Sequence, residues 1–120
     1  MKNILVIEDD RLISSLVSFR LKKAGYHVTM AHDGLSGIEV ISQEEPDLII
    51  TDFLVPFRDG IDIINHAKKV NPDTPIIVLS SLGDEDSAVL EAFSLGISDF
   101  MPKPFYPNEL ALRVRRLIEN

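Results

Sequence analysis

Cysteine is absent from this chain of 120 residues. Disulfide bridges, thiolate metal sites and cysteine nucleophiles are therefore excluded. The sequence also lacks the ~20 consecutive apolar residues of a membrane-spanning helix, and it opens into an apolar strand pattern without the basic segment and apolar stretch of a signal peptide. We therefore expect a soluble, cytoplasmic domain.

Positive charge is scarce, because 12 lysine and arginine residues face 19 acidic residues and the net charge is −7. A domain this acidic is not expected to bind nucleic acid or an anionic membrane by itself. The length favours a single domain over residues 1–120, and a domain of this size buries roughly 65% of the surface of its unfolded chain. Linkers, repeats and low-complexity segments are absent as well.

Five short apolar segments are spaced along the chain, and we expect each to form a β-strand. They lie at 4–7, 27–31, 48–51, 76–79 and 99–102. Several are apolar at nearly every position, as in strands that are buried on both faces of a parallel sheet.

Helical patterns separate these segments. The first predicted helix has Asp10 as its N-cap and ends at Gly25, which suits a left-handed C-terminal position. Its expected apolar stripe is Leu12, Ile13, Leu16, Val17 and Leu21. Further helices are expected at 35–44, after Asp59, at 84–95 and around residues 110–118. Five alternating βα units predict an α/β fold with helices on both faces of a parallel sheet.

Polar side chains follow four of the predicted strands directly. They are Glu8 and Asp9 after the first strand, Asp52 after the third, Ser80 after the fourth and Lys103 after the fifth. Ligands of open α/β sheets bind beyond the carboxyl ends of the strands, so we expect these groups to meet at one edge. Carboxylates, a hydroxyl and an ammonium at one edge predict a site for a divalent cation and a phosphoryl group.

Four segments carry this pattern: ILVIEDD at 4–10, PDLIITDFLVPFRDG at 46–60, PIIVLSS at 75–81 and GISDFMPKPF at 96–105. Together, over the whole length of the chain, they resemble the receiver domain of bacterial two-component response regulators. The resemblance implies a flavodoxin-like (βα)5 three-layer sandwich, in which the five-stranded parallel sheet has the strand order 2-1-3-4-5.

The resemblance also implies a function, which is to accept a phosphoryl group on Asp52 from a histidine kinase or a phosphotransfer protein. Such a domain is not an enzyme, although it assists its own phosphoryl transfer and dephosphorylation, and it switches conformation to control an output domain or a partner. By resemblance, Mg²⁺ is held by Asp9 and Asp52, by Glu8 through water, and by the backbone carbonyl of Leu54. With no cation bound, repulsion among these carboxylates should raise at least one pKa.

The phosphoryl group is expected to be stabilised by Lys103 and by a serine hydroxyl. Ser80 is favoured for this role because its distance from Pro75 fits the family. The separation from Ser80 to Gly96 is one residue longer than the family pattern, so either the intervening loop carries an insertion or Ser81 holds the hydroxyl.

Phe100 matches the aromatic switch of the family, whose side chain turns inward when the hydroxyl moves to the phosphoryl group. The resemblance also implies a cis peptide bond between Lys103 and Pro104. An ordinary strand aromatic remains the other interpretation of Phe100.

Partners are expected on the face made by the fourth helix, the fifth strand and the fifth helix, where many regulators form phosphorylation-dependent dimers through salt bridges. Asp99, Glu109 and Arg113 match that set. Residues 84–95 contain no lysine or arginine, which argues against this particular homodimer.

Each residue also has an interpretation without function. Glu8 and Asp9 could belong to a simple loop before the cap, Asp52 could open a turn, and Lys103 could be a solvated charge. A flavodoxin is disfavoured because acids replace its phosphate loop, and a haloacid dehalogenase because the Asp-x-Asp motif is missing. A receiver-like interaction module that is never phosphorylated is the remaining alternative. The three histidines, which lack metal-ligand spacing, are expected at the surface: His27, His32 and His66.

Overall fold

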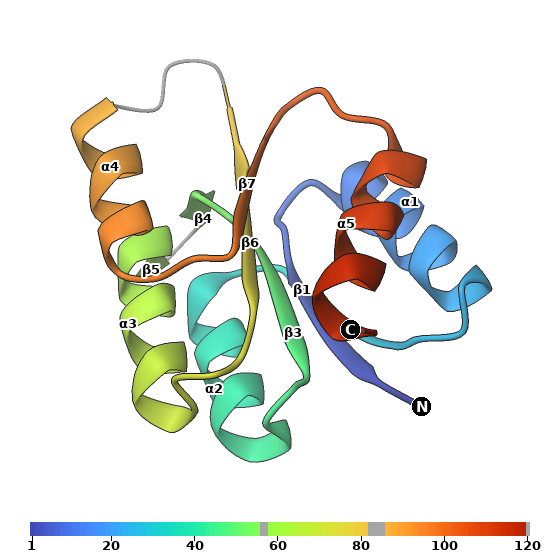
Figure 1. Cartoon of the computed structure of the whole chain (residues 1–120), viewed down its shortest axis with the longest axis horizontal. Coiled ribbons are helices and arrows are strands. Elements are labelled where there is room, and N and C mark those ends of the chain that lie inside the picture. The colour runs from blue at the N-terminus through green and yellow to red at the C-terminus, as the bar shows by residue number, and fades with distance from the viewer. Residues whose placement is uncertain (56–57, 82–85, 120) are drawn as a thin grey trace.

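The computed structural model describes residues 1–55, 58–81 and 86–119. Five parallel strands form its central sheet: β1 (Asn3–Ile7), β2 (His27–Ala31), β3 (Leu48–Asp52), β6 (Ile76–Ser80) and β7 (Asp99–Pro102). Their order across the sheet is β2-β1-β3-β6-β7 (Figure 1). Counted along the chain as five strands, this is the order 2-1-3-4-5, so the predicted flavodoxin-like fold is confirmed.

Two layers of helices cover the sheet. They are α1 (Arg11–Lys23), α2 (Gly34–Glu44), α3 (Gly60–Val70), α4 (Asp86–Ser94) and α5 (Pro107–Ile118). Figure 1 shows α1 and α5 on one side of the sheet and α2, α3 and α4 on the other. Within the described residues, none of the helices has both the length and the apolar character that crossing a membrane requires.

Alternating strand residues supply two separate cores. Ile4 and Val6 pack in the cluster under α1 and α5, whereas Leu5 and Ile7 pack in the cluster under α2, α3 and α4. Since successive side chains of a strand point to opposite faces, a strand between two helical layers must be apolar throughout. This requirement explains the short apolar runs of the sequence.

Three predicted helix ends agree with the structure. Asp10 caps α1 by accepting hydrogen bonds from the backbone N–H groups of Leu12, at 2.9 Å, and Ile13, at 3.2 Å. Gly25 has a φ of 100°, the left-handed conformation expected after a helix. Asp59 caps α3 in the same way as Asp10 caps α1. These caps fix where the chain leaves the sheet.

The predicted apolar stripe of α1 is wrong in part. Leu12 and Leu16 are 69% and 51% exposed, although both were expected to be buried. The buried side of α1 is instead Ser14, Val17, Ser18 and Leu21. These residues follow the spacing i, i+3, i+4, i+7, and the two serines are small enough to let the helix lie close to the sheet. Leu12 and Leu16 therefore belong to the outer surface of the helix.

A short hairpin follows Asp52 and was not foreseen from the sequence. β4 (Leu54–Val55) pairs with β5 (Arg58–Asp59) in antiparallel register. The backbone N–H of Gly60 donates to the carbonyl of Phe53 at 2.7 Å, which closes the loop. A Cβ atom at Gly60 would lie 2.8 Å from that carbonyl oxygen, so the close approach requires glycine. The hairpin turns the chain back immediately beyond Asp52.

The predicted helix at 84–95 is observed in part. α4 begins at Asp86 and ends at Ser94, while residues 84 and 85 lie outside the described residues.

Candidate functional site

Three carboxylates meet at the carboxyl edge of the sheet. One oxygen from each of Glu8, Asp9 and Asp52 can be chosen so that all three atoms lie within 4.8 Å of one another. Glu8 and Asp52 are buried, whereas Asp9 is exposed. Asp52 is the last residue of β3 and Glu8 directly follows β1, the neighbouring strand. Parallel strands end at the same edge, which brings residues 44 positions apart into one cluster.

Lys103 reaches this cluster from the end of β7. Its Nζ atom lies 2.7 Å from Oε1 of Glu8 and 2.8 Å from Oδ2 of Asp52. Its backbone N–H donates to the carbonyl of Ser80 at 2.7 Å, and the peptide bond to Pro104 is cis, the isomer that the resemblance implies. The ammonium group of Lys103 thus contacts two buried carboxylates.

This arrangement changes the ionisation of the site. Burial raises the pKa of Asp52 from 3.8 to about 7, because an ionised carboxylate loses hydration; Lys103 opposes the rise, and Glu8 adds to it. The expectation of a raised pKa is confirmed, although burial is a larger cause than repulsion. Burial disfavours the ammonium of Lys103, but the hydrogen bonds to Asp52 and Glu8 prevail and raise its pKa.

The donor set fits magnesium. Mg²⁺ prefers oxygen ligands in octahedral geometry and keeps several waters, and here two buried carboxylates adjoin one that is exposed. The exposed side at Asp9 leaves room for those waters. Leu54, whose carbonyl is the expected backbone ligand, begins β4 two residues after Asp52.

The two candidate serines occupy different surroundings. Ser80 ends β6 and is buried, and by strand alternation it shares the face of Val78, under α2, α3 and α4. Phe100 packs in the same cluster, with its ring centroid 5.7 Å from that of Phe93 on α4. Ser81 is exposed and lines a pocket on the α1 side. Ser80 is thus the serine that shares a face with Phe100.

Three residues were expected to form salt bridges between two copies of the domain. In this structure they form salt bridges with one another within a single chain. Arg113 lies 2.8 Å from Oδ1 of Asp99 and 2.8 Å from Oε1 of Glu109, through separate guanidinium nitrogens. The described part of α4, Asp86–Ser94, contains no lysine or arginine.

His32 is a residue near the site that sequence reasoning missed. It was expected at the surface, but it is half-buried, and its Nδ1 atom lies 3.0 Å from the backbone carbonyl oxygen of Glu8. His66 is partly exposed on α3 and lies 2.7 Å from the hydroxyl of Ser42 on α2, and His27 is exposed, so both lie at the surface as expected. The available signal was the position of His32 directly after β2, at the edge where Glu8 follows β1.

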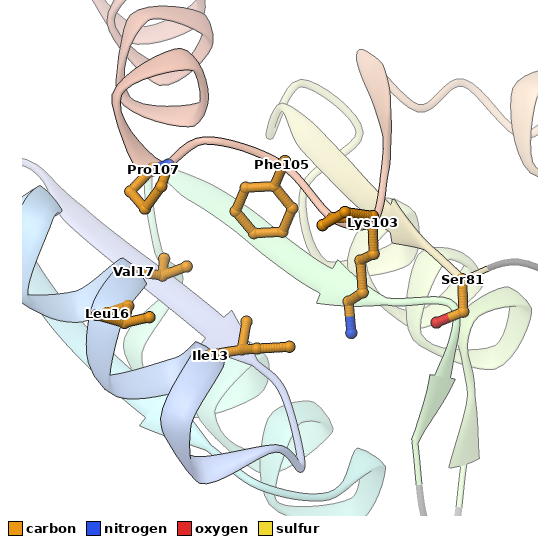
Figure 2. A pocket seen from close by; sticks show the side chains of 8 residues that line it. Ile13, Leu16, Val17, Ser81, Lys103, Phe105 and Pro107 are labelled. Atoms are coloured by element: carbon orange, nitrogen blue, oxygen red, sulfur yellow. The ribbon is translucent and has the colours of Figure 1, made fainter.

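An apolar pocket of about 310 Å³ adjoins the site. Figure 2 shows Phe105 and Pro107 on one side of it and Ile13, Leu16 and Val17 of α1 on the other, with Lys103 nearby. Leu16, which is exposed, and Lys103 both line this pocket, so an apolar hollow adjoins the residue that contacts Glu8 and Asp52.

Comparison with known proteins agrees with the fold. The family model of the response regulator receiver domain matches residues 4–115. The receiver domain of the Francisella response regulator 1452 is 32% identical over 99% of this chain and 98% of that chain, with a TM-score of 0.88. The BeF3-activated DrrB receiver domain is also 32% identical, over 100% of this chain and 99% of that one, with a TM-score of 0.88.

A CheY-like receiver domain protein from Methanospirillum hungatei is 23% identical and has a TM-score of 0.94, over 99% of this chain and 94% of that one. At this identity the similarity supports the fold alone. The chain belongs to the family of response regulator receiver domains of two-component signalling. Domains of this family act with histidine kinases and output domains.

Proposed function

We propose that this chain is a phosphoacceptor and that Asp52 accepts a phosphoryl group from a phosphohistidine of a partner kinase or phosphotransfer protein. The observation that carries the proposal is the position of Asp52, buried at the end of β3, in contact with Lys103 and next to Glu8 and Asp9. The chain is not proposed to turn over a substrate as an enzyme, although its residues assist the transfer.

In the proposed step a carboxylate oxygen of Asp52 attacks phosphorus. A P–O bond forms, the P–N bond to the donor imidazole breaks, and the electron pair of that bond leaves with the imidazole. Catalysis of such transfers rests on in-line positioning and on neutralising charge at the transferring oxygens. Lys103, which holds Asp52 in the resting protein, is free to pair with a phosphoryl oxygen as the carboxylate becomes an acyl phosphate.

Glu8, Asp9, Asp52 and the carbonyl of Leu54 would hold Mg²⁺, which supplies charge neutralisation at the phosphoryl oxygens when bound. The residues themselves provide the oxygen donors and keep the phosphoryl oxygens close to Lys103. A pKa of about 7 for Asp52 means that cation binding competes with a proton on that carboxyl group. Magnesium affinity should therefore increase as the pH rises through about 7.

The donor has to approach the carboxyl edge of the sheet. Exposed Leu12 and Leu16 of α1 and the apolar pocket beside Lys103 flank that edge. They offer contact area to a protein that presents its phosphohistidine to Asp52.

Signalling requires a conformational element that links Asp52 to a distant surface. We infer that the Ser80 hydroxyl moves toward the phosphoryl group and that Phe100 fills the space it leaves. Two contacts support this path: Phe100 packs in the cluster that Ser80 adjoins, and its ring contacts Phe93 of α4. Half-buried Phe100 lies on β7, so its movement would alter the surface of α4, β7 and α5, where an output domain or partner is expected to bind.

The proposal is tested by incubating the protein with acetyl phosphate and MgCl₂ and analysing the intact mass. The wild type should gain one phosphoryl group with the acid stability and base lability of an acyl phosphate, and Asp52→Asn should gain none. Asp73→Asn, at an exposed acid, serves as the matched control and should label like the wild type. Equal labelling of Asp52→Asn, or no labelling of the wild type, would contradict the proposal. The second result would favour an interaction module that is never phosphorylated.

A further inference from the structure

The imidazole of His32 contacts the loop that carries the acids Glu8 and Asp9, although no role was assigned to it from the sequence. Its Nδ1 atom lies 3.0 Å from the carbonyl oxygen of Glu8. A carbonyl oxygen only accepts hydrogen bonds, so the contact requires the proton on Nδ1. His32 is half-buried at the end of β2, between the sheet and the start of α2.

Both backbone polar groups of Glu8 are held by the end of β2 and the residue that follows it. Its N–H donates to the carbonyl of Ala31 at 3.0 Å, and its carbonyl accepts from the His32 side chain. Beyond His32 the backbone turns away from the sheet, because Asp33 caps α2 by accepting from the N–H of Ser36 at 2.7 Å. The imidazole therefore extends the attachment of the β1–α1 loop to β2 beyond the last paired strand residues, Ile7 and Ala31.

The turn from Glu8 to Asp10 is anchored at both ends. Asp10 is fixed to α1 by its cap, and its N–H also donates to Oε2 of Glu8 at 3.2 Å. Asp9 lies between these anchors and is exposed, so few contacts of its own side chain restrain it. Its position is set mainly by the backbone on either side.

We propose that His32 is a positioning residue, which fixes the Glu8 carbonyl and thereby holds Asp9 and Glu8 where they coordinate a divalent cation. The inference rests on the proposed function, because it assigns the cation site to those acids. Groups that orient metal ligands through hydrogen bonds contribute to metal affinity, and their removal commonly weakens it. In the wild type, this hydrogen bond orders the loop before the cation binds. Without it, part of the binding free energy is used to order the loop, so the affinity for the cation should fall.

The test is a magnesium titration by calorimetry of the wild type, His32→Ala and His32→Asn. The net worth of one hydrogen bond corresponds to a loss of roughly three- to tenfold in affinity for His32→Ala. His32→Asn should recover most of it, because the amide nitrogen of asparagine occupies nearly the position of Nδ1. His66→Ala, at the other half-buried histidine, is the matched control and should bind magnesium like the wild type.

A second readout is the rate of labelling by acetyl phosphate at increasing MgCl₂. A positioning role predicts that His32→Ala raises the half-saturating magnesium concentration, while its rate at saturating magnesium stays within about twofold of the wild type. Circular dichroism of each variant checks that it is folded.

The outcomes separate the two proposals. If the wild type binds no magnesium, the proposed cation site itself fails and the role of His32 falls with it. If the wild type binds magnesium and His32→Ala binds it equally well, only the positioning role is overturned. If folded His32→Asn is as weak as His32→Ala, the hydrogen-bond donor is not what matters, and the inference is wrong.

Discussion

Asp52→Asn should stabilise the metal-free protein above neutral pH. The folded protein raises the pKa of Asp52 from 3.8 to about 7, mainly because the carboxyl group is buried. Asparagine keeps the shape of the side chain and an oxygen that can accept from Lys103, but it carries no charge. The variant therefore removes the cost of ionising a buried group.

The magnitude follows from the shift. About 3 pKa units correspond to an upper limit of about 4 kcal/mol, since each unit is worth 1.36 kcal/mol. Solvent screening and relaxation of the site reduce this value, so we expect a gain of about 2 kcal/mol in the free energy of unfolding at pH 8. For a domain of this length that gain corresponds to roughly 5–10 °C in Tm.

The pH dependence gives the sharper test. Because the pKa of Asp52 is raised in the folded protein, the native state binds more protons than the unfolded state between about pH 4 and pH 7. The contribution of Asp52 to the stability of the wild type therefore falls as the pH rises through that window. The advantage of Asp52→Asn should therefore be less than half as large at pH 5 as at pH 8.

The assay is urea denaturation in EDTA at both pH values. Glu91→Gln, at an exposed acid on α4, controls for the change in net charge and should alter stability by less than about 0.5 kcal/mol. If Asp52→Asn gains nothing at pH 8, or gains equally at both pH values, the burial of a charged Asp52 is not a cost to the fold.

Three further outcomes are expected. Millimolar MgCl₂ should raise the Tm of the wild type, since a ligand that binds only the folded state stabilises it, and Asp9→Ala should lose this response; an equal shift in both would put the cation elsewhere. Gly60→Ala should lower the free energy of unfolding by about 1–3 kcal/mol, because the new Cβ would lie 2.8 Å from the Phe53 carbonyl oxygen. Urea denaturation measures this change, and an unchanged midpoint would mean that the loop shifts without cost. Ser80→Ala should still accept a phosphoryl group, but its amide spectrum should show smaller shifts at Phe100 and α4 when beryllofluoride, a mimic of the phosphoryl group, is added. A response like that of the wild type would exclude Ser80 as the switch hydroxyl and leave Ser81.

The sequence by itself determined the order of the five sheet strands and the helices between them, and it indicated which groups to expect at the site. Strands buried on both faces must be apolar throughout, so the runs at 48–51 and 76–79 could be recognised without any tertiary information. The carboxyl ends of parallel strands share one edge, so the residues after those runs could be assigned to a common site. Asp10 and Gly25 could be placed because helix ends depend on local backbone chemistry.

Only the tertiary structure decided which surfaces face inward and how the charges are balanced. Leu12 and Leu16 fit a helical stripe, but burial depends on where the sheet lies relative to the helix, and here Ser14 and Ser18 face it. Lys103 contacts both Glu8 and Asp52, and the depth of Asp52 sets its pKa. The position of His32 beneath the Glu8 carbonyl is another such case. Local sequence specifies secondary structure and caps, whereas contacts between segments that are 24 to 95 residues apart exist only after the sheet has assembled.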